Sequence, residues 1–216
     1  MTFTIDLLPS IAIKRTDSET GRTYETPEGN NYQSITSLLS KQPNSALDSW
    51  RVAVGPDEAN RISRKAATRG TILHKQAELY LLNKDIKFKN FLEKMLFDSF
   101  KPLLNRIDNI RLLEGALYSD ILRLAGTVDG VAEFDGVLSI IDFKTANSRK
   151  EKSMIENYFI QVTAYSYMVE ERYNLRIPNI AIMIAVDNDK PQLFIENRNN
   201  WKSKLKLLLQ GNIHVQ

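Results

Sequence analysis

The sequence predicts a single domain of the α/β or α+β class, with strands and helices behind a helical N-terminal cap. Its 216 residues suit one domain of ordinary size, which can bury roughly 70% of its unfolded surface. Apolar residues recur at helical spacing between residues 44 and 105. After residue 109 the pattern changes to that of strands, then to a helix and two further strands.

The first 43 residues are predicted to form a turn-rich β segment with one short helix. Glycine, proline and asparagine interrupt strand-like pieces around Tyr24 and Tyr32. Ser34 and Thr36 are both candidate caps for a helix that ends at Ser40. This segment therefore precedes the helical region rather than belonging to it.

Residues 44–105 are predicted to be helical. Four helices are expected, over residues 44–54, 56–69, 70–83 and 89–104. Asn44 or Ser45 caps the first of them, and Gly55 ends it. Gly70 is interpreted as the junction between the second and the third.

Residues 106–216 are predicted to form the α/β core. Strands are expected over residues 111–117, 121–134, 137–143, 180–186 and 192–196. Asp135-Gly136 is a strong hairpin signal between two of them. Helices are expected over residues 151–174 and 199–210.

The composition excludes several kinds of site. The chain has no cysteine, so disulfides, thiolate zinc sites, iron–sulfur clusters and cysteine nucleophiles are all excluded. Any metal ion must be held by oxygen or imidazole. The start of the chain lacks a basic region typical of a signal peptide, and no apolar run approaches the roughly 20 residues of a spanning helix. We therefore expect no membrane association and an intracellular, cytoplasmic location, in a bacterium or a phage-infected cell.

The charge of the chain is nearly balanced. It has 29 Lys and Arg against 26 Asp and Glu, a formal net charge of +3. Such a balance argues against a purely electrostatic coat around nucleic acid. It is compatible with a local basic channel around an acidic site.

The densest chemical signal lies between residues 126 and 144. Asp129 and Asp142 fall on neighbouring antiparallel strands, and Lys144 shares a strand face with Asp142. Two carboxylates can hold Mg²⁺ or Mn²⁺, which polarises a phosphate and activates water. The lysine can orient that water or offset charge on the phosphate. The alternative interpretation is a surface Asp–Lys pair with a turn aspartate.

Two helices carry further candidates. Gln161 and Tyr165 are one turn apart and share a helix face, where they can contact phosphate or a base. His74 lies on an earlier helix with Glu78 on the same face, and its imidazole can complete an oxygen-rich metal site. The other histidine, His214, lies near the C-terminus.

A basic stretch surrounds His74 in the sequence. No acidic residue occurs between Glu58 and Glu78, whereas five basic ones do. They are Arg61, Arg64, Lys65, Arg69 and Lys75. We interpret the stretch either as a solvated helix face or as a wall that follows a phosphate backbone.

Four short motifs in this order resemble the PD-(D/E)XK nuclease superfamily, in its RecB-type exonuclease branch of mitochondrial and small bacteriophage enzymes. They are Gly-Thr-Ile-Leu-His at 70–74, Gly-Thr-Val-Asp at 126–129, Asp-Phe-Lys-Thr at 142–145 and Gln-Val-Thr-Ala-Tyr at 161–165. The resemblance covers about residues 32–195. It implies a restriction-endonuclease-like core with a central mixed sheet flanked by helices, and a helical arch over residues 44–105.

The resemblance also implies roles for individual residues. His74, Asp129 and Asp142 would be metal ligands, together with the backbone carbonyl of Phe143. Lys144 would be the catalytic lysine. The chain lacks the flanking cysteines of the iron–sulfur members of this branch.

A second pair of residues completes the implied site. Gln161 and Tyr165 match a motif that supports the active site and contacts substrate. A further acid is often present in the family, and Glu78 and Glu114 are both candidates. Glu78 shares the helix face of His74, whereas Glu114 begins the strand that leads towards Asp129, so the choice stays open.

The function implied is a Mg²⁺- or Mn²⁺-dependent DNA exonuclease that prefers single-stranded DNA and acts in replication, repair or recombination. The basic residues would follow the DNA backbone, and Tyr32, Trp50 and Tyr158 would stack bases. A single-strand-binding or recombination protein is a conceivable partner. The alternatives are a structure-specific or flap endonuclease, a non-catalytic DNA-binding accessory with a vestigial site, and a purely structural protein.

Overall fold

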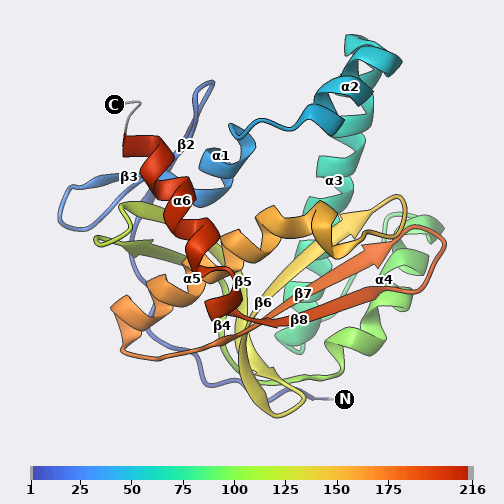
Figure 1. The fold of residues 1–216 in the computed structure, drawn as a ribbon. Helices are drawn as coiled ribbons and strands as arrows, with labels where there is room; N and C mark the ends of the chain where they lie inside the picture. The colour runs from blue at the N-terminus through green and yellow to red at the C-terminus, as the bar shows by residue number, and fades with distance from the viewer. Residues whose placement is uncertain (1, 214–216) are drawn as a thin grey trace.

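The computed structural model describes residues 2–213 and contains an eight-stranded sheet flanked by helices (Figure 1). His214 lies outside the described residues. The strands are β1 (Lys14–Ser18), β2 (Gly21–Glu25), β3 (Asn31–Ser34), β4 (Ile107–Ser119), β5 (Leu124–Phe134), β6 (Val137–Ala146), β7 (Asn179–Val186) and β8 (Gln192–Asn197). The helices are α1 (Ile35–Ser40), α2 (Ser45–Val54), α3 (Pro56–Leu81), α4 (Phe91–Leu104), α5 (Glu156–Tyr173) and α6 (Lys202–Ile213), with short 3₁₀ helices η1 (Lys152–Ile155) and η2 (Arg198–Asn200).

The sheet is mixed, as the family resemblance implied. Strands β4, β5 and β6 are antiparallel neighbours, whereas β6 and β7 are parallel and are connected through α5. The Asp135-Gly136 turn between β5 and β6 is confirmed, and both residues have the positive φ angles, 50° and 77°, that a tight hairpin turn requires. Strand β7 is buried on both faces, which explains its uninterrupted apolar sequence.

Strand β5 has different neighbours along its two edges. Strand β4 pairs with it from Leu124 to Phe134 and so occupies one whole edge. Strands β6 and β3 must then share the other edge. There β6 pairs with residues 130–134 and β3 with Leu124 and Ala125. Within the described part of the chain, residues 126–129 therefore have no strand partner at this edge, which leaves a gap in the sheet between β3 and β6.

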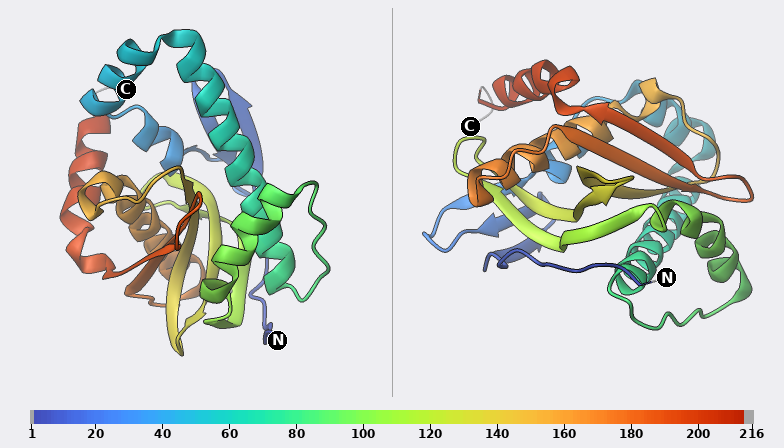
Figure 2. Two further views of the ribbon diagram at one scale, coloured as in Figure 1. Left: turned by 90° about the vertical axis from the view of Figure 1, so that its right-hand side faces the viewer. Right: turned by 90° about the horizontal axis from the view of Figure 1, so that it is seen from below.

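Helices cover both faces of the sheet (Figure 2). Helices α1, α5 and α6 pack on one face, where Ile140 of β6 is buried among their apolar side chains. Helices α3 and α4 pack on the other face, where the next residue, Ile141, is buried with Leu73 and Phe100. This alternation buries both faces of the central strands. It also holds α3 against the face to which Ile141 points.

Several predicted element boundaries differ from those of the structure. Residues 56–81 form one continuous helix rather than two, because Gly70 causes no break and Leu73, Ala77 and Leu81 anchor the second half on the sheet. Strand β5 begins at Leu124 rather than 121, since residues 120–123 form a turn. Strand β4 is longer than predicted and contains a bulge.

The helical region of residues 44–105 has two parts. Helix α2 and the first half of α3 project beyond the sheet (Figure 2), and α2 has no buried residue. Helix α4, in contrast, packs on the sheet through Phe97, Phe100 and Leu104. From residue 2 to residue 213, no helix has both the length and the apolar character needed to cross a membrane.

Candidate active site

The gap along β5 contains the two predicted aspartates. The β5–β6 ladder ends at the pair Gly130–Ile141, so Asp129 and Asp142 follow where the strands separate. The backbone N–H of Phe143 donates to Oδ2 of Asp129 at 2.7 Å instead of to a strand. Both aspartates are nearly inaccessible to solvent, with 7% and 1% of their surface exposed. Carboxylates this deeply buried require charged or hydrogen-bonding partners.

Lys144 and Gln161 supply partners for Asp142. Lys144 lies on the same strand face, as predicted, and its Nζ is 2.5 Å from Oδ2 of Asp142. Gln161, on α5, donates from Nε2 to Oδ1 of the same carboxylate at 3.1 Å. The Lys144 ammonium also lies 5.0 Å from the ring centre of Tyr158. The carboxylate is thus held from two sides.

Tyr165 depends on the glycine of the second motif. Its hydroxyl lies 3.5 Å from Nε2 of Gln161, one helical turn earlier. A Cβ atom at Gly126 would lie 2.7 Å from the Tyr165 ring, closer than such atoms pack, so only glycine leaves room for this ring. Burial and the nearby aspartates raise the pKa of Tyr165 well above its ordinary value, so its hydroxyl remains a donor.

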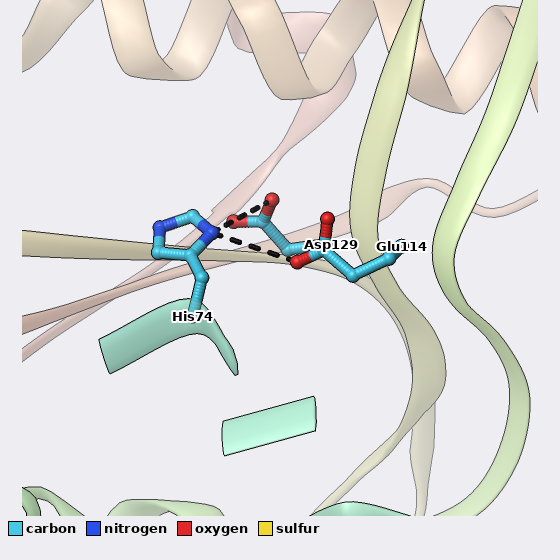
Figure 3. Close-up of side chains that lie close together, drawn as sticks. All are labelled: His74, Glu114 and Asp129. Carbon is cyan, nitrogen blue, oxygen red and sulfur yellow. Dashed lines mark ion pairs between the residues drawn. The ribbon is translucent and has the colours of Figure 1, made fainter. Parts of the chain in front are cut away.

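His74 of α3 lies beside the carboxylates of Asp129 and Glu114 (Figure 3). Its Nδ1 lies 3.4 Å from Oδ1 of Asp129 and 3.6 Å from Oε1 of Glu114. His74, Glu114 and Asp129 each offer one ligand atom, and the three atoms lie within 4.8 Å of one another. On its other side, Nε2–H of His74 donates to the carbonyl of Phe143 at 2.7 Å. The imidazole is thereby fixed in orientation.

Glu114, rather than Glu78, belongs to this cluster. Glu114 has a φ angle of 46°, and its neighbours Leu113 and Gly115 pair with Gly130 and Val128, the neighbours of Asp129. Glu78 lines the same cavity, but its carboxylate pairs with Lys75 at 2.7 Å. Of the two acids left open by the sequence, the geometry favours Glu114.

The site stabilises cations strongly. Burial disfavours a charged imidazole, but Asp129 and Glu114 outweigh it and raise the pKa of His74 to about 10. Burial raises the pKa of Asp142 to about 6, against the opposing effect of Lys144. Although Lys144 is buried, Asp142 and Asp129 raise its pKa, so it is charged at neutral pH. A metal ion at this site would have to displace the His74 proton.

The donor set fits a divalent metal ion. Two carboxylates and one imidazole, converging from different elements, suit Mn²⁺ or Mg²⁺. Two of the predicted ligands have other contacts: Asp142 binds Lys144 and Gln161, and the Phe143 carbonyl accepts from His74. Their roles as ligands stay predictions, since binding an ion would require these contacts to rearrange.

A cavity of about 730 Å³ opens over the cluster. It is within the roughly 300–1,000 Å³ of sites that hold small organic ligands. Its wall includes His74, Glu114, Asp129, Lys144, Gln161 and Tyr165, together with Lys75 and the motif residues Gly70, Thr71 and Thr127. The N-terminal β segment also contributes Arg15 and Arg22, which were not among the residues predicted for the site. Their local sequence gives no sign of where the hairpin lies.

Most residues of the predicted basic stretch do not line the cavity over the cluster. Arg64, Lys65 and Arg69 line a second cavity of about 1,530 Å³, between α3, α4 and the β7–β8 turn. Arg69 donates to Asn147 at 2.6 Å and pairs with Asp187. Arg61 pairs with Glu58 on the surface, which leaves Lys75 as the member of the basic stretch that lines the smaller cavity.

The predicted stacking aromatics also differ in position. Tyr32 is buried against Tyr118, and its hydroxyl donates to Asp120 at 2.7 Å, so it is not available to stack a base. Tyr158 lies against Lys144 beside the site. Trp50 is partly exposed on the projecting helix α2.

Curated relatives match a large part of the chain. It is 26% identical over 165 residues to the human mitochondrial genome maintenance exonuclease 1. This alignment covers 71% of this chain and 47% of the relative. It is 32% identical over 99 residues to the mouse protein of the same name, in an alignment that covers 44% of this chain and 29% of that relative. The chain thus spans about half the length, or less, of these relatives.

A solved structure and a family model complete the comparison. A crystal structure from Eubacterium rectale, of a protein provisionally named an exonuclease, aligns with a TM-score of 0.47 and 12% identity, covering 67% of this chain and 65% of that one. The family model of the PD-(D/E)XK nuclease superfamily matches residues 57–204, which include the whole cluster and Lys144. The chain therefore belongs to the PD-(D/E)XK nuclease superfamily.

Proposed function

We propose that this protein is a divalent-metal-dependent DNA exonuclease that prefers single-stranded DNA and leaves 5′-phosphate ends, in DNA replication, repair or recombination. The observation that supports it most directly is the buried arrangement at the gap in the sheet. There the Asp142–Lys144 pair lies beside the His74–Glu114–Asp129 cluster, on the wall of one cavity. The exonuclease names of the curated relatives favour digestion from an end.

Each residue of this arrangement has a role in the proposal. His74, Glu114 and Asp129 would hold the ion, and Asp142 would join them once its contacts rearrange. When bound, Mg²⁺ or Mn²⁺ would supply charge to polarise the scissile phosphate and to lower the pKa of water. Lys144 would orient the attacking water and offset charge on the phosphate. Gln161 and Tyr165 would hold Asp142 in place and contact the DNA.

Digestion of end-labelled oligonucleotides tests the proposal. Wild-type protein should degrade single-stranded DNA in Mg²⁺ or Mn²⁺ and not in EDTA. Asp142→Ala and Lys144→Ala should each lower the rate by at least about 10²-fold, because charge stabilisation in the transition state is lost. Lys206→Ala, an exposed lysine on α6, is the matched control and should keep the wild-type rate. Absence of cleavage with either metal would refute the proposal.

Three further measurements separate the alternatives. Circular single-stranded DNA should resist a strict exonuclease, whereas an endonuclease would cut it. A non-catalytic DNA-binding accessory with a vestigial site would bind DNA without cleaving it, and calorimetry would detect no Mn²⁺ binding at low-micromolar concentration. Comparing single-stranded with duplex substrates in the same assay tests the strand preference.

A further inference from the structure

The β1–β2 hairpin presents two arginines to the active-site cavity. In its register Arg15 pairs with Tyr24 and Asp17 with Arg22, so these four side chains share one face. Arg15 and Arg22 both line the cavity that contains His74 and Lys144. The opposite face carries Lys14, whose side chain is 77% exposed and lies 3.6 Å from Glu25. The hairpin therefore has a face towards the site and a face away from it.

Contacts with the sheet and with α1 hold the hairpin in place. Tyr24 is buried, and its hydroxyl lies 3.3 Å from that of Thr127, on the strand that carries Asp129. The backbone N–H of Arg22 donates to Oγ of Ser37 at 2.8 Å. Gly21, with a φ angle of 126°, permits this approach, because a Cβ atom there would lie 3.1 Å from Ser37. The arginines thus extend from an anchored element.

The two guanidinium groups are arranged around one carboxylate. Nε of Arg22 donates to Oδ1 of Asp17 at 2.8 Å, and Nε of Arg15 donates to Oδ2 at 2.8 Å. Arg22 pairs with Asp17 through Nε. The two terminal amino groups of Arg22 are not used in this hydrogen bond. Two arginines and one aspartate carry a net charge of +1, and guanidinium groups match the geometry of phosphate oxygens.

We propose that Arg15 and Arg22 bind a backbone phosphate of the DNA strand whose neighbouring phosphodiester lies at the His74–Asp129 cluster. The inference rests on the proposed nuclease function and extends it. Asp17 orients both guanidinium groups, and the hairpin and α3 both contribute to the wall of the cavity. Lys75 on α3 lines the same cavity but pairs with Glu78, so the excess positive charge that this proposal uses comes from the hairpin.

Equilibrium binding in EDTA, where no cleavage occurs, tests this phosphate site. The probe is a fluorescein-labelled single-stranded oligonucleotide, titrated at several salt concentrations with wild type, Arg15→Ala, Arg22→Ala and Lys14→Ala. The two arginine variants should weaken binding about tenfold at low salt, and the slope of log K against log salt should decrease by about 0.7. Lys14→Ala removes the same charge from the other face of the hairpin and should bind like wild type.

The outcomes separate this inference from the proposed function. Equal losses in Lys14→Ala and the arginine variants, or no loss in the latter, would overturn the phosphate site. If Arg22→Ala lowers the melting temperature, Arg15→Ala decides, because its half-exposed side chain can be removed without disturbing the core. If wild type cleaves DNA and both arginine variants bind DNA like wild type, the phosphate site is refuted and the nuclease function stands. If both variants lose binding and wild type does not cleave DNA, the nuclease function is refuted and the phosphate site stands.

Discussion

At the scale of single residues, the backbone of Glu114 decides which acid joins the cluster. Its φ angle of 46° lies in the left-handed region, which non-glycine residues rarely occupy. Such conformations cost on the order of 1–3 kcal/mol and gather at functional sites. In β4, Glu114 lies between the paired residues Leu113 and Gly115, and its carboxylate lies beside His74.

Metal affinity should therefore distinguish the two glutamates. Glu114→Gln replaces one of the two converging carboxylates by a neutral amide, a weaker ligand, and should weaken Mn²⁺ binding at least about tenfold. Glu78 lines the same cavity but lies outside the cluster, so Glu78→Gln should change the affinity for Mn²⁺ little. Isothermal titration with Mn²⁺ measures both. A larger loss in Glu78→Gln than in Glu114→Gln would contradict the arrangement.

Two glycines of the motifs should respond oppositely to alanine. At Gly126 a methyl group would collide with the buried Tyr165 ring, so Gly126→Ala should lower the free energy of unfolding by about 1–3 kcal/mol. At Gly70, within α3, a methyl group would lie 3.8 Å from Thr145, an ordinary contact. Gly70→Ala should therefore be neutral or stabilising by up to about 1 kcal/mol. Urea denaturation measures both, and equal effects would show that the Tyr165 contact is unimportant.

At the scale of elements, α3 carries His74 over the gap and separates the two cavities. Near its middle, Arg69 binds Asn147, beyond the end of β6, and Asp187, beyond the end of β7. These contacts, together with the apolar second half of the helix, fix α3 relative to the sheet. Arg69 thus helps to hold α3 in position on the sheet, whether or not it also contacts DNA.

The stability of this attachment can be measured. Arg69→Ala should lower the free energy of unfolding by about 1–2 kcal/mol, because Asp187 loses its charged partner. Arg64→Ala, on an exposed turn of the same helix, should stay within about 0.5 kcal/mol of wild type. A double-mutant cycle with Asp187→Ala should show coupling between Arg69 and Asp187. Additive effects in that cycle would mean that the ion pair does not hold the helix.

Local sequence predicted the elements whose signals are local. The Asp135-Gly136 hairpin and the apolar strand β7 are examples, because turn geometry and continuous burial leave a direct pattern. The break at Gly70 was wrong because a single helical glycine costs only about 1 kcal/mol, which anchoring on the sheet can outweigh. The start of β5 was missed because Glu171, about 50 residues away, holds the preceding turn through the N–H of Asp120.

The candidate site was predictable to a similar extent. Strand alternation placed Asp142 and Lys144 on one face, with Asp129 on the neighbouring strand. The set of ligands that includes His74 came from the family resemblance, and the structure brings these residues together. The choice of Glu114 depended on a left-handed backbone that no sequence pattern indicates. The arginines of the hairpin depend on β3 joining β5, a pairing of segments some 90 residues apart. Long-range pairing, rather than residue type, limited the prediction.

At the scale of the whole molecule, metal binding should stabilise the fold. The donors come from α3, β4 and β5, so an intact site exists only in the folded chain. An ion that binds only the folded state adds about 2.7 kcal/mol at 100 times its dissociation constant. Mn²⁺ should raise the melting temperature of wild type and do so less in Glu114→Gln at the same concentration. An equal rise in both proteins would place the ion elsewhere.

The gap along β5 has a mechanical consequence. Within the described sheet, the β1–β3 part and the β6–β8 part are joined through β5 alone. A small change in the twist of β5 would rotate these two parts against each other without breaking a strand-to-strand hydrogen bond. One part carries Arg22 and the other carries Lys144, so the coiling of β5 contributes to the width of the groove between them.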